Sequence, residues 1–175
     1  MTDWPQLVET HGPAVWSTIY RMVNNMEAAR DCYQETFLAA LRESQRRPID
    51  NWAGFLKTVA TRRAIDHLRR RYRHRDLFRP LTDLDQPTQR SCAVDQSMRD
   101  EQLSDELRRA LATLAPRQSQ AFCLRYMEDM SLGEIAARLG TPSGNVSVLI
   151  NRARSRLRDA LAQSGNTISF CEVRP

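Results

Sequence analysis

Residues 131–154 are the stretch that most constrains the fold, because their capping, turn and apolar positions predict two helices joined by a tight turn. Ser131 and Glu134 have capping-box spacing, in which a hydroxyl and a carboxylate each satisfy a backbone amide. Gly140 can end the first helix in the left-handed conformation, and Thr141 and the proline after it can cap and open the second. Apolar residues recur at helical spacing in both segments: Leu132, Ile135, Ala136 and Leu139, then Val146, Ile150, Ala153 and Leu157. The stretch is predicted to be a helix-turn-helix, with an ordinary helical hairpin as the alternative.

The polar face of the second of these helices is the candidate surface for duplex DNA. In a helix-turn-helix the second helix lies in the major groove and its exposed side chains contact base edges. The predicted contact residues are Ser143, Asn145, Ser147, Val148, Asn151, Arg152 and Arg154. If the hairpin is only structural, the same face meets water.

Helical periodicity covers most of the remaining sequence, so the predicted fold class is all-α. Further helices are expected over residues 5–25, 27–45, 52–75, from near 101, and from Pro116 to about 128. Residues 76–100 lose the periodicity and are rich in proline and polar residues, which is typical of a flexible linker. We predict two small helical domains, the second a four-helix domain that ends in the helix-turn-helix, with the boundaries 1–75, linker 76–100, 101–162 and a loose tail 163–175.

The helix predicted to start at Trp52 carries dense positive charge in its second half. Asp66 is its single acidic residue, so the face repels itself unless an anion binds. Arginines interleaved with planar side chains suit a nucleic-acid backbone with exposed bases, and a solvated basic face is the alternative. The residues concerned are Arg62, Arg63, Arg69, Arg70, Arg71, Arg73 and Arg75, with His67, Tyr72 and His74.

The helix predicted over residues 27–45 carries a compact polar cluster. Asp31, Gln34 and Glu35 share one face by their spacing of three and four residues. Such a face is either solvated or a protein docking site, and composition alone does not choose between them.

Composition excludes several other classes of function. The net charge is +5, and all 26 basic residues except Lys57 are arginine, which suits nucleic acid but also follows from a GC-rich genome. Four separated cysteines form no metal-ligand spacing, and Cys32 and Cys123 are expected in the core. We find no catalytic motif, and predict no enzyme activity, no cofactor and no metal. Without a signal peptide or an apolar run of about 20 residues, we expect a cytoplasmic protein that is not inserted in a membrane.

Two separated groups of motifs resemble the extracytoplasmic-function (ECF) sigma factors of bacterial RNA polymerase. The likeness to their first domain rests on Asp31-Cys-Tyr-Gln34-Glu35-Thr-Phe37 and on Ala64-Ile65-Asp66-His67-Leu68-Arg69-Arg70-Arg71. The likeness to their second domain rests on Leu114-Ala-Pro-Arg117-Gln118, on Ser131 to Gly140 and on Arg152-Ala153-Arg154. Either group alone is moderately specific, and both in this order are highly specific.

The resemblance implies a set of partners and site residues. Core RNA polymerase would be contacted by Asp31, Gln34 and Glu35, and promoter DNA by both domains. The helix-turn-helix would read the −35 element as a duplex, and an anti-sigma protein holds many members of the family. The −10 element, opened to a single strand, would meet Asn51, Trp52, Arg62, Arg63, Arg69, Arg70, Arg71 and Arg73.

The sequence departs from the family pattern at three positions. Arg62 stands where the family often has asparagine, so the −10 base preference is expected to differ. Ser147 and Leu149 stand where the family often has cations, so contact with the −35 element is expected to be weaker. Two alternatives therefore stay open, a stand-alone helix-turn-helix regulator and a module that sequesters a partner and has lost DNA binding.

Overall fold

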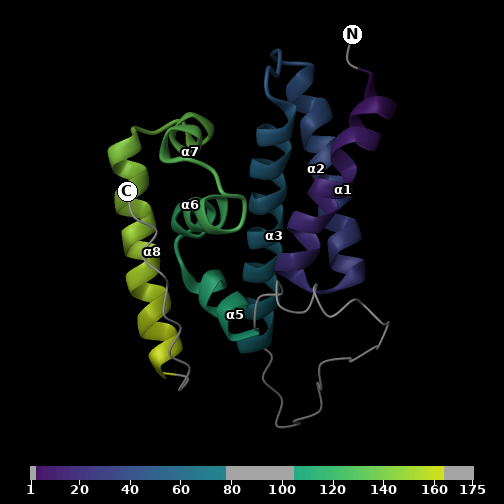
Figure 1. Cartoon of the computed structure of the whole chain (residues 1–175). Helices are drawn as coiled ribbons and strands as arrows, with labels where there is room; N and C mark the ends of the chain where they lie inside the picture. The colour runs from purple at the N-terminus through teal and green to yellow at the C-terminus, as the bar shows by residue number, and fades with distance from the viewer. Residues whose placement is uncertain (1–2, 78–104, 164–175) are drawn as a thin grey trace.

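The computed structural model describes residues 3–77 and 105–163, which form helices and no strand. The predicted all-α class is therefore confirmed. In Figure 1 the long helix α3 stands between the α1–α2 pair and the group made by α5 to α8. We call α1–α3 the first unit and α5–α8 the second. The helices are α1 (Trp4–Val23), α2 (Met26–Ser44), α3 (Trp52–Leu77), α5 (Asp105–Thr113), α6 (Pro116–Tyr126), α7 (Leu132–Leu139) and α8 (Ser143–Gln163).

Side-chain caps set the helix ends of the first unit. The Asp3 side chain accepts a hydrogen bond from a first-turn amide of α1, and that helix ends at Asn24 in the left-handed conformation. The next residue, Asn25, caps α2, so that two adjacent asparagines end one helix and begin another. The Asn51 side chain accepts a hydrogen bond from the Gly54 amide at 2.8 Å and opens α3. Caps of this kind depend on neighbouring residues in the sequence. The predicted ends of these three helices therefore lie within about two residues of the observed ends.

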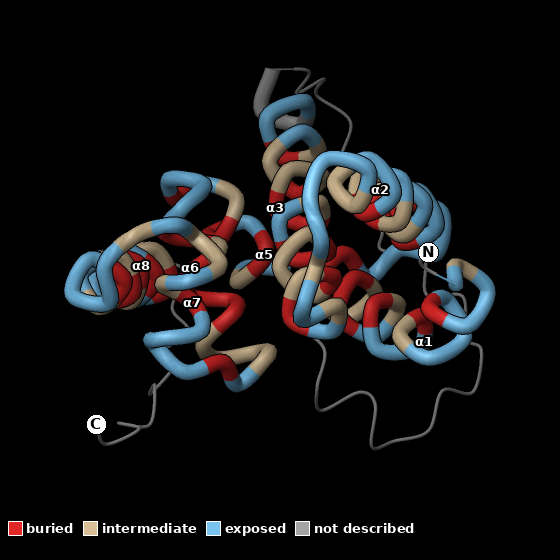
Figure 2. Tube along the Cα trace, turned by 90° about the horizontal axis from the view of Figure 1, so that it is seen from above, coloured by how far each residue is buried: buried red, intermediate tan, exposed pale blue. Residues whose placement is uncertain are grey.

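A single large core connects the two units. It joins Met22, Val23, Leu56 and Ile65 of the first unit to residues of α5, α6 and α8 such as Leu111. Figure 2 shows buried positions concentrated where α3 meets its neighbours, and exposed positions on the outer sides of α2 and α8. A smaller cluster fills the space between α6, α7 and α8: Ala121, Leu124, Met130, Ile135, Val146 and Ile150. The sequence predicted the helices but not that the units share a core.

One predicted core position is wrong: Leu132 is 37% exposed, because it lies at the edge of its apolar stripe, where no neighbouring helix covers it. Val8 and Leu41, which also continue apolar stripes by their spacing, are exposed to the same extent. Burial of Cys32 and Cys123 is confirmed, and it raises the pKa of their thiols to about 11 and about 12. Both thiols are therefore core groups rather than nucleophiles.

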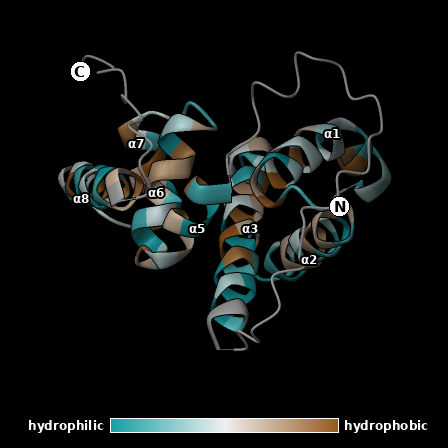
Figure 3. Ribbon diagram, turned by 90° about the horizontal axis from the view of Figure 1, so that it is seen from below, coloured by the Kyte–Doolittle hydropathy of each residue, from teal (hydrophilic) through white to brown (hydrophobic). Residues whose placement is uncertain are grey.

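The predicted linker and tail fall almost entirely outside the described residues. Two residues of the predicted linker, Asp76 and Leu77, extend α3, and Gln163 is the last residue of α8. Figure 3 shows hydrophobic positions on the inward sides of the helices and hydrophilic ones near the free end of α3. Over residues 3–77 and 105–163, no helix combines the length and the apolar character that crossing a bilayer requires.

Candidate nucleic-acid interface

The predicted helix-turn-helix is present as α7, a short turn and α8. The Ser131 amide donates to Glu134 Oε2 at 2.8 Å, and the Glu134 amide donates to Ser131 Oγ at 3.2 Å, which completes the capping box. The Ser131 hydroxyl also donates to Glu134 Oε2 at 2.7 Å, and this bond, together with the one from the Ser131 amide, lowers the pKa of the Glu134 carboxyl. Gly140 adopts φ +60° and ends α7, as predicted.

The start of α8 differs from the prediction by one residue. The Pro142 carbonyl accepts from the Asn145 amide at 3.0 Å and from the Val146 amide at 3.2 Å. Pro142 therefore precedes the first helical residue, Ser143, instead of occupying the first turn. The Thr141 hydroxyl accepts from the Asn145 side chain at 3.4 Å and caps no backbone amide among the hydrogen bonds of the described chain.

The outer face of α8 is open to solvent. The predicted apolar stripe of α8 is buried, and the opposite face of the helix is therefore directed outward. The buried residues are Val146, Ile150, Ala153 and Leu157. The exposed candidates on that face are Ser143, Asn145, Val148, Asn151 and Arg152. Figure 1 places α8 at the side of the second unit that is farther from α3. This face is therefore accessible to a duplex while the two units are packed together.

Three residues near this face are less available than the sequence suggested. Ser147 is half-buried and donates to the Ser143 carbonyl at 3.4 Å. Leu149 is half-buried and packs against the smaller core cluster. Arg154 is half-buried, and its Nε is buried without a hydrogen-bond partner. Arg152 is consequently the most accessible cation of the predicted set.

The arginines of α3 divide into exposed and engaged side chains. Arg62, Arg70 and Arg73 are exposed, although Arg62 lies 3.9 Å from Asp66. Arg63 forms an ion pair with Glu35 of α2 at 3.5 Å. Arg69 and Arg71 are half-buried, and the Arg71 guanidinium lies 5.7 Å from the centre of the Tyr72 ring.

Two planar groups expected to stack on bases are covered in this structure. Tyr72 is 5% exposed, and its hydroxyl donates to the Asp105 carboxylate at 2.6 Å. Burial and this hydrogen bond raise the Tyr72 pKa to about 12. Trp52 is half-buried, with its ring centre 5.6 Å from Trp4 and 6.3 Å from Phe55. The prediction of an open aromatic face is wrong for Tyr72, since a partner from the second unit covers it.

The outer face of α2 extends beyond the predicted polar cluster. Asp31 and Gln34 are exposed, whereas Glu35 is half-buried beside Arg63. Leu38 is 51% exposed and continues the same face one turn further along the helix. This apolar extension was not predicted, although the spacing of Leu38 from Gln34 and Glu35 places it on the same face.

The two halves of the chain each match a family model. Residues 7–74 match Sigma-70 region 2, and residues 104–157 match Sigma-70 region 4. The RNA polymerase sigma factor CarQ of Myxococcus xanthus is 34% identical over 158 residues, which cover 90% of this chain and 88% of CarQ. The ECF RNA polymerase sigma factor SigE of Mycolicibacterium smegmatis is 34% identical over 163 residues. The chain belongs to the ECF sigma factors. Sigma factors of this class act in transcription initiation.

The fold agrees with this membership. The solved complex of sigma factor RpoE with the anti-sigma factor NepR from Bartonella quintana has a TM-score of 0.55 at 21% identity, over 93% of this chain and 98% of that one. The match to SigE covers 93% of this chain but 63% of SigE, so the chain is shorter than that relative.

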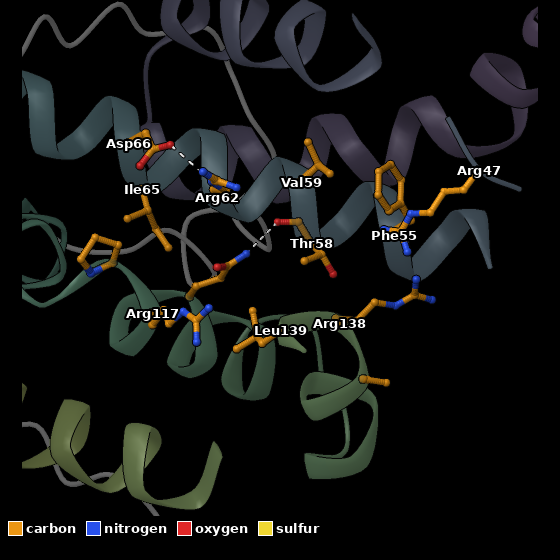
Figure 4. Close-up of a pocket in the computed structure, with 13 residues that line it drawn as sticks. Arg47, Phe55, Thr58, Val59, Arg62, Ile65, Asp66, Arg117, Arg138 and Leu139 are labelled. Carbon is orange, nitrogen blue, oxygen red and sulfur yellow. Dashed lines mark hydrogen bonds and ion pairs between the residues drawn. The ribbon is translucent and has the colours of Figure 1, made fainter. Parts of the chain in front are cut away.

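A groove lies between the two units of the sigma factor. It has a volume of about 560 Å³ and an apolar floor that includes Phe55, Ile65 and Leu139. Figure 4 shows Arg47 and Arg62 on the side of the first unit, and Arg117 and Arg138 on the side of the second. The sequence pattern did not predict that these four arginines line one groove.

Proposed function

We propose that this sigma factor binds core RNA polymerase through α2, holds the opened −10 element with α3 and reads the −35 element with α8. The observation that carries the proposal is the separation of three surfaces on three helices: the Asp31–Leu38 face, the α3 arginines and the open face of α8. Each surface suits a different partner. One chain can therefore connect polymerase to two promoter elements.

The α3 surface suits a single strand. Arg62, Arg70 and Arg73 are exposed and can contact phosphates, and arginine also stacks on bases that have left the duplex. Bases held in this way cannot re-pair, so binding favours strand opening. The polymerase makes the RNA, and the sigma factor contributes binding energy without a covalent step of its own. It would act in the cytoplasm, with the polymerase and the chromosome.

The α8 surface suits base edges in a major groove. Asn145 and Asn151 carry amides that pair well with adenine, and Val148, 46% exposed, suits a thymine methyl group. Arg152 provides a phosphate contact beside them. Because Ser147 and Leu149 provide no charge, we expect duplex binding of the isolated protein to be weak and polymerase to be needed for tight promoter binding.

Run-off transcription with purified core polymerase tests the proposal. The template set is a collection of genomic fragments that includes the region upstream of this gene. We expect specific transcripts from a few fragments, and their absence from all fragments would overturn the proposal.

A second test addresses polymerase binding by α2. We expect Leu38→Asp to reduce co-purification with core polymerase by about tenfold or more, as for a central interface residue. Met26→Asp is the matched control, because Met26 is 57% exposed at the other end of the same helix. The double substitution of Gln34 and Glu35 by alanine should act like Leu38→Asp. If all three variants bind polymerase like the wild type, a stand-alone helix-turn-helix regulator becomes the better description.

A further inference from the structure

The carboxylate of Glu128 ties the second unit to the first. Glu128 lies in the turn between α6 and α7, and its side chain is 4% exposed. Its Oε1 accepts a hydrogen bond from the Thr18 hydroxyl at 2.8 Å and from Arg21 Nη2 at 3.0 Å. Lys57 Nζ lies 3.1 Å from its Oε2. Thr18 and Arg21 belong to α1 and Lys57 to α3, so these three contacts form only while the units are packed.

In most other polar contacts between the units, a side chain of one unit donates a hydrogen bond to a backbone carbonyl of the other. The guanidinium of Arg108, a residue 4% exposed, donates through Nε to the Met22 carbonyl at 2.8 Å. Gln120 donates to the Thr58 carbonyl at 3.3 Å. Both ion pairs of Glu128 join the second unit to the first. Removing its charge leaves two cations facing a neutral group in a covered site, which is costly.

The groove on this interface is lined by arginines of both units. Arg47 and Arg62 of the first unit face Arg117 and Arg138 of the second across it (Figure 4). Glu43 and Asp66 pair with the first two, but both acids belong to the first unit. Because both acids lie on the first-unit side, the excess positive charge of the groove is on Arg117 and Arg138 of the second unit.

Packing also occupies residues proposed to bind the −10 element. Arg69 Nη1 donates to the Leu114 carbonyl, and Arg138 donates to the Asn51 carbonyl at 3.3 Å. Tyr72, on the same helix, is held by Asp105. A DNA strand on this part of α3 and the second unit compete for the same groups.

Promoter geometry requires the units to separate. The −10 and −35 elements lie about 25 base pairs apart, which is roughly 85 Å of B-form DNA at 3.4 Å per base pair. The whole of α3, with 26 residues, is about 39 Å long, and α6 packs beside it. The packed molecule therefore cannot place α3 and α8 on both elements at once.

We propose that Glu128 is an intramolecular latch: its contact with Arg21 and Lys57 holds the units packed and withholds Asn51 and Arg69 from DNA until the units separate. The consequence for DNA rests on the proposed function, whereas the packing does not. Core polymerase and promoter DNA favour the separated form because both bind it better. The free energy of the latch contact must be overcome when the units separate, so it lowers the apparent affinity for both partners.

The test uses the full chain with Glu128→Gln and Lys57→Met, which remove opposite ends of one ion pair. Asp129→Asn is the matched control, because it removes an equal charge from the adjacent, exposed residue. Asp129 has φ 52°, a conformation that asparagine also adopts, so the backbone is not strained by the change. Small-angle X-ray scattering measures the radius of gyration, and circular dichroism checks that helix content is unchanged. We expect both latch variants to be larger than the wild type and the control to match it.

The second measurement is binding of a fluorescent single-stranded DNA of mixed sequence. We expect the latch variants to bind it about tenfold tighter than Asp129→Asn, and Arg69→Ala in the Glu128→Gln background to reverse most of that gain. Equal radii for the latch variants and the control would overturn the latch. Larger radii without tighter binding would overturn the masking of Asn51 and Arg69. Run-off transcription by the wild type judges the proposed function independently of both results.

Discussion

Replacing Gly140 by alanine isolates the backbone requirement of the turn between α7 and α8. Gly140 has φ +60°, and a Cβ added there would meet no atom within 4 Å, so the substitution causes no clash. The left-handed conformation costs an alanine about 1–2 kcal/mol. Alanine recovers about 0.4–1 kcal/mol by restricting the unfolded chain. The free energy of unfolding should therefore fall by about 1 kcal/mol in a urea titration followed by circular dichroism.

Two further glycines of the same motif provide controls of opposite sign. Gly133 lies in α7 and Gly144 in α8, and a Cβ at either would also meet no atom within 4 Å. Each is the second residue of its helix, where alanine is favoured over glycine by less than the about 0.5–1 kcal/mol of a helix interior. We expect Gly133→Ala and Gly144→Ala to raise the free energy of unfolding. If Gly140→Ala is as stable as these two variants, the left-handed turn does not constrain the motif and the reasoning is wrong.

Three further predictions concern the capping box, the open face of α8 and the thiols. Because hydrogen bonds from Ser131 lower the folded-state pKa of Glu134, its contribution is present above the ordinary pKa of 4.5 and is lost as the pH falls below it. The difference in unfolding free energy between the wild type and Glu134→Ala should therefore shrink in acid, and a constant difference would contradict this. In duplex titrations, Arg152→Ala should weaken binding similarly for all sequences and reduce the salt slope by about 1, whereas Asn145→Ala should change the sequence preference; identical behaviour would refute the assignment. Because burial raises their pKa values, Cys32 and Cys123 should resist iodoacetamide in the folded chain and react in urea, as peptide mass spectrometry can show.

Helix positions and the helix-turn-helix followed from the sequence because they depend on neighbouring residues. The capping box needs two residues three positions apart, and the turn needs a glycine that accepts positive φ. The stripe of α8 that begins at Val146 lies on one face of one helix. Each of these features is local, so the covalent spacing of the side chains already contains it.

The exposure of individual side chains was less predictable, because the spacing of apolar residues does not show how far a neighbouring helix extends over them. Val8, Leu41 and Leu132 continue their stripes by spacing but lie beyond the edge of a neighbouring helix. Tyr72 differs in the opposite direction: it is buried because its hydroxyl donates to Asp105, which lies 33 residues further along the chain. The predicted contact residues on α2, α3 and α8 remain predictions that the proposed variants test.

The sequence by itself determined the helices, the motif that joins α7 to α8 and the membership of the sigma factor family. Tertiary structure alone decided how the two units meet. Arg108 and Glu128 are charged residues in helical surroundings, and no local pattern distinguishes them from solvated ones. They are covered because their partners, Met22 for one and Arg21 and Lys57 for the other, lie far away in the chain. Burial of a charge depends on partners brought together only by folding, and for that reason the proposed latch could be found in the structure and not in the sequence.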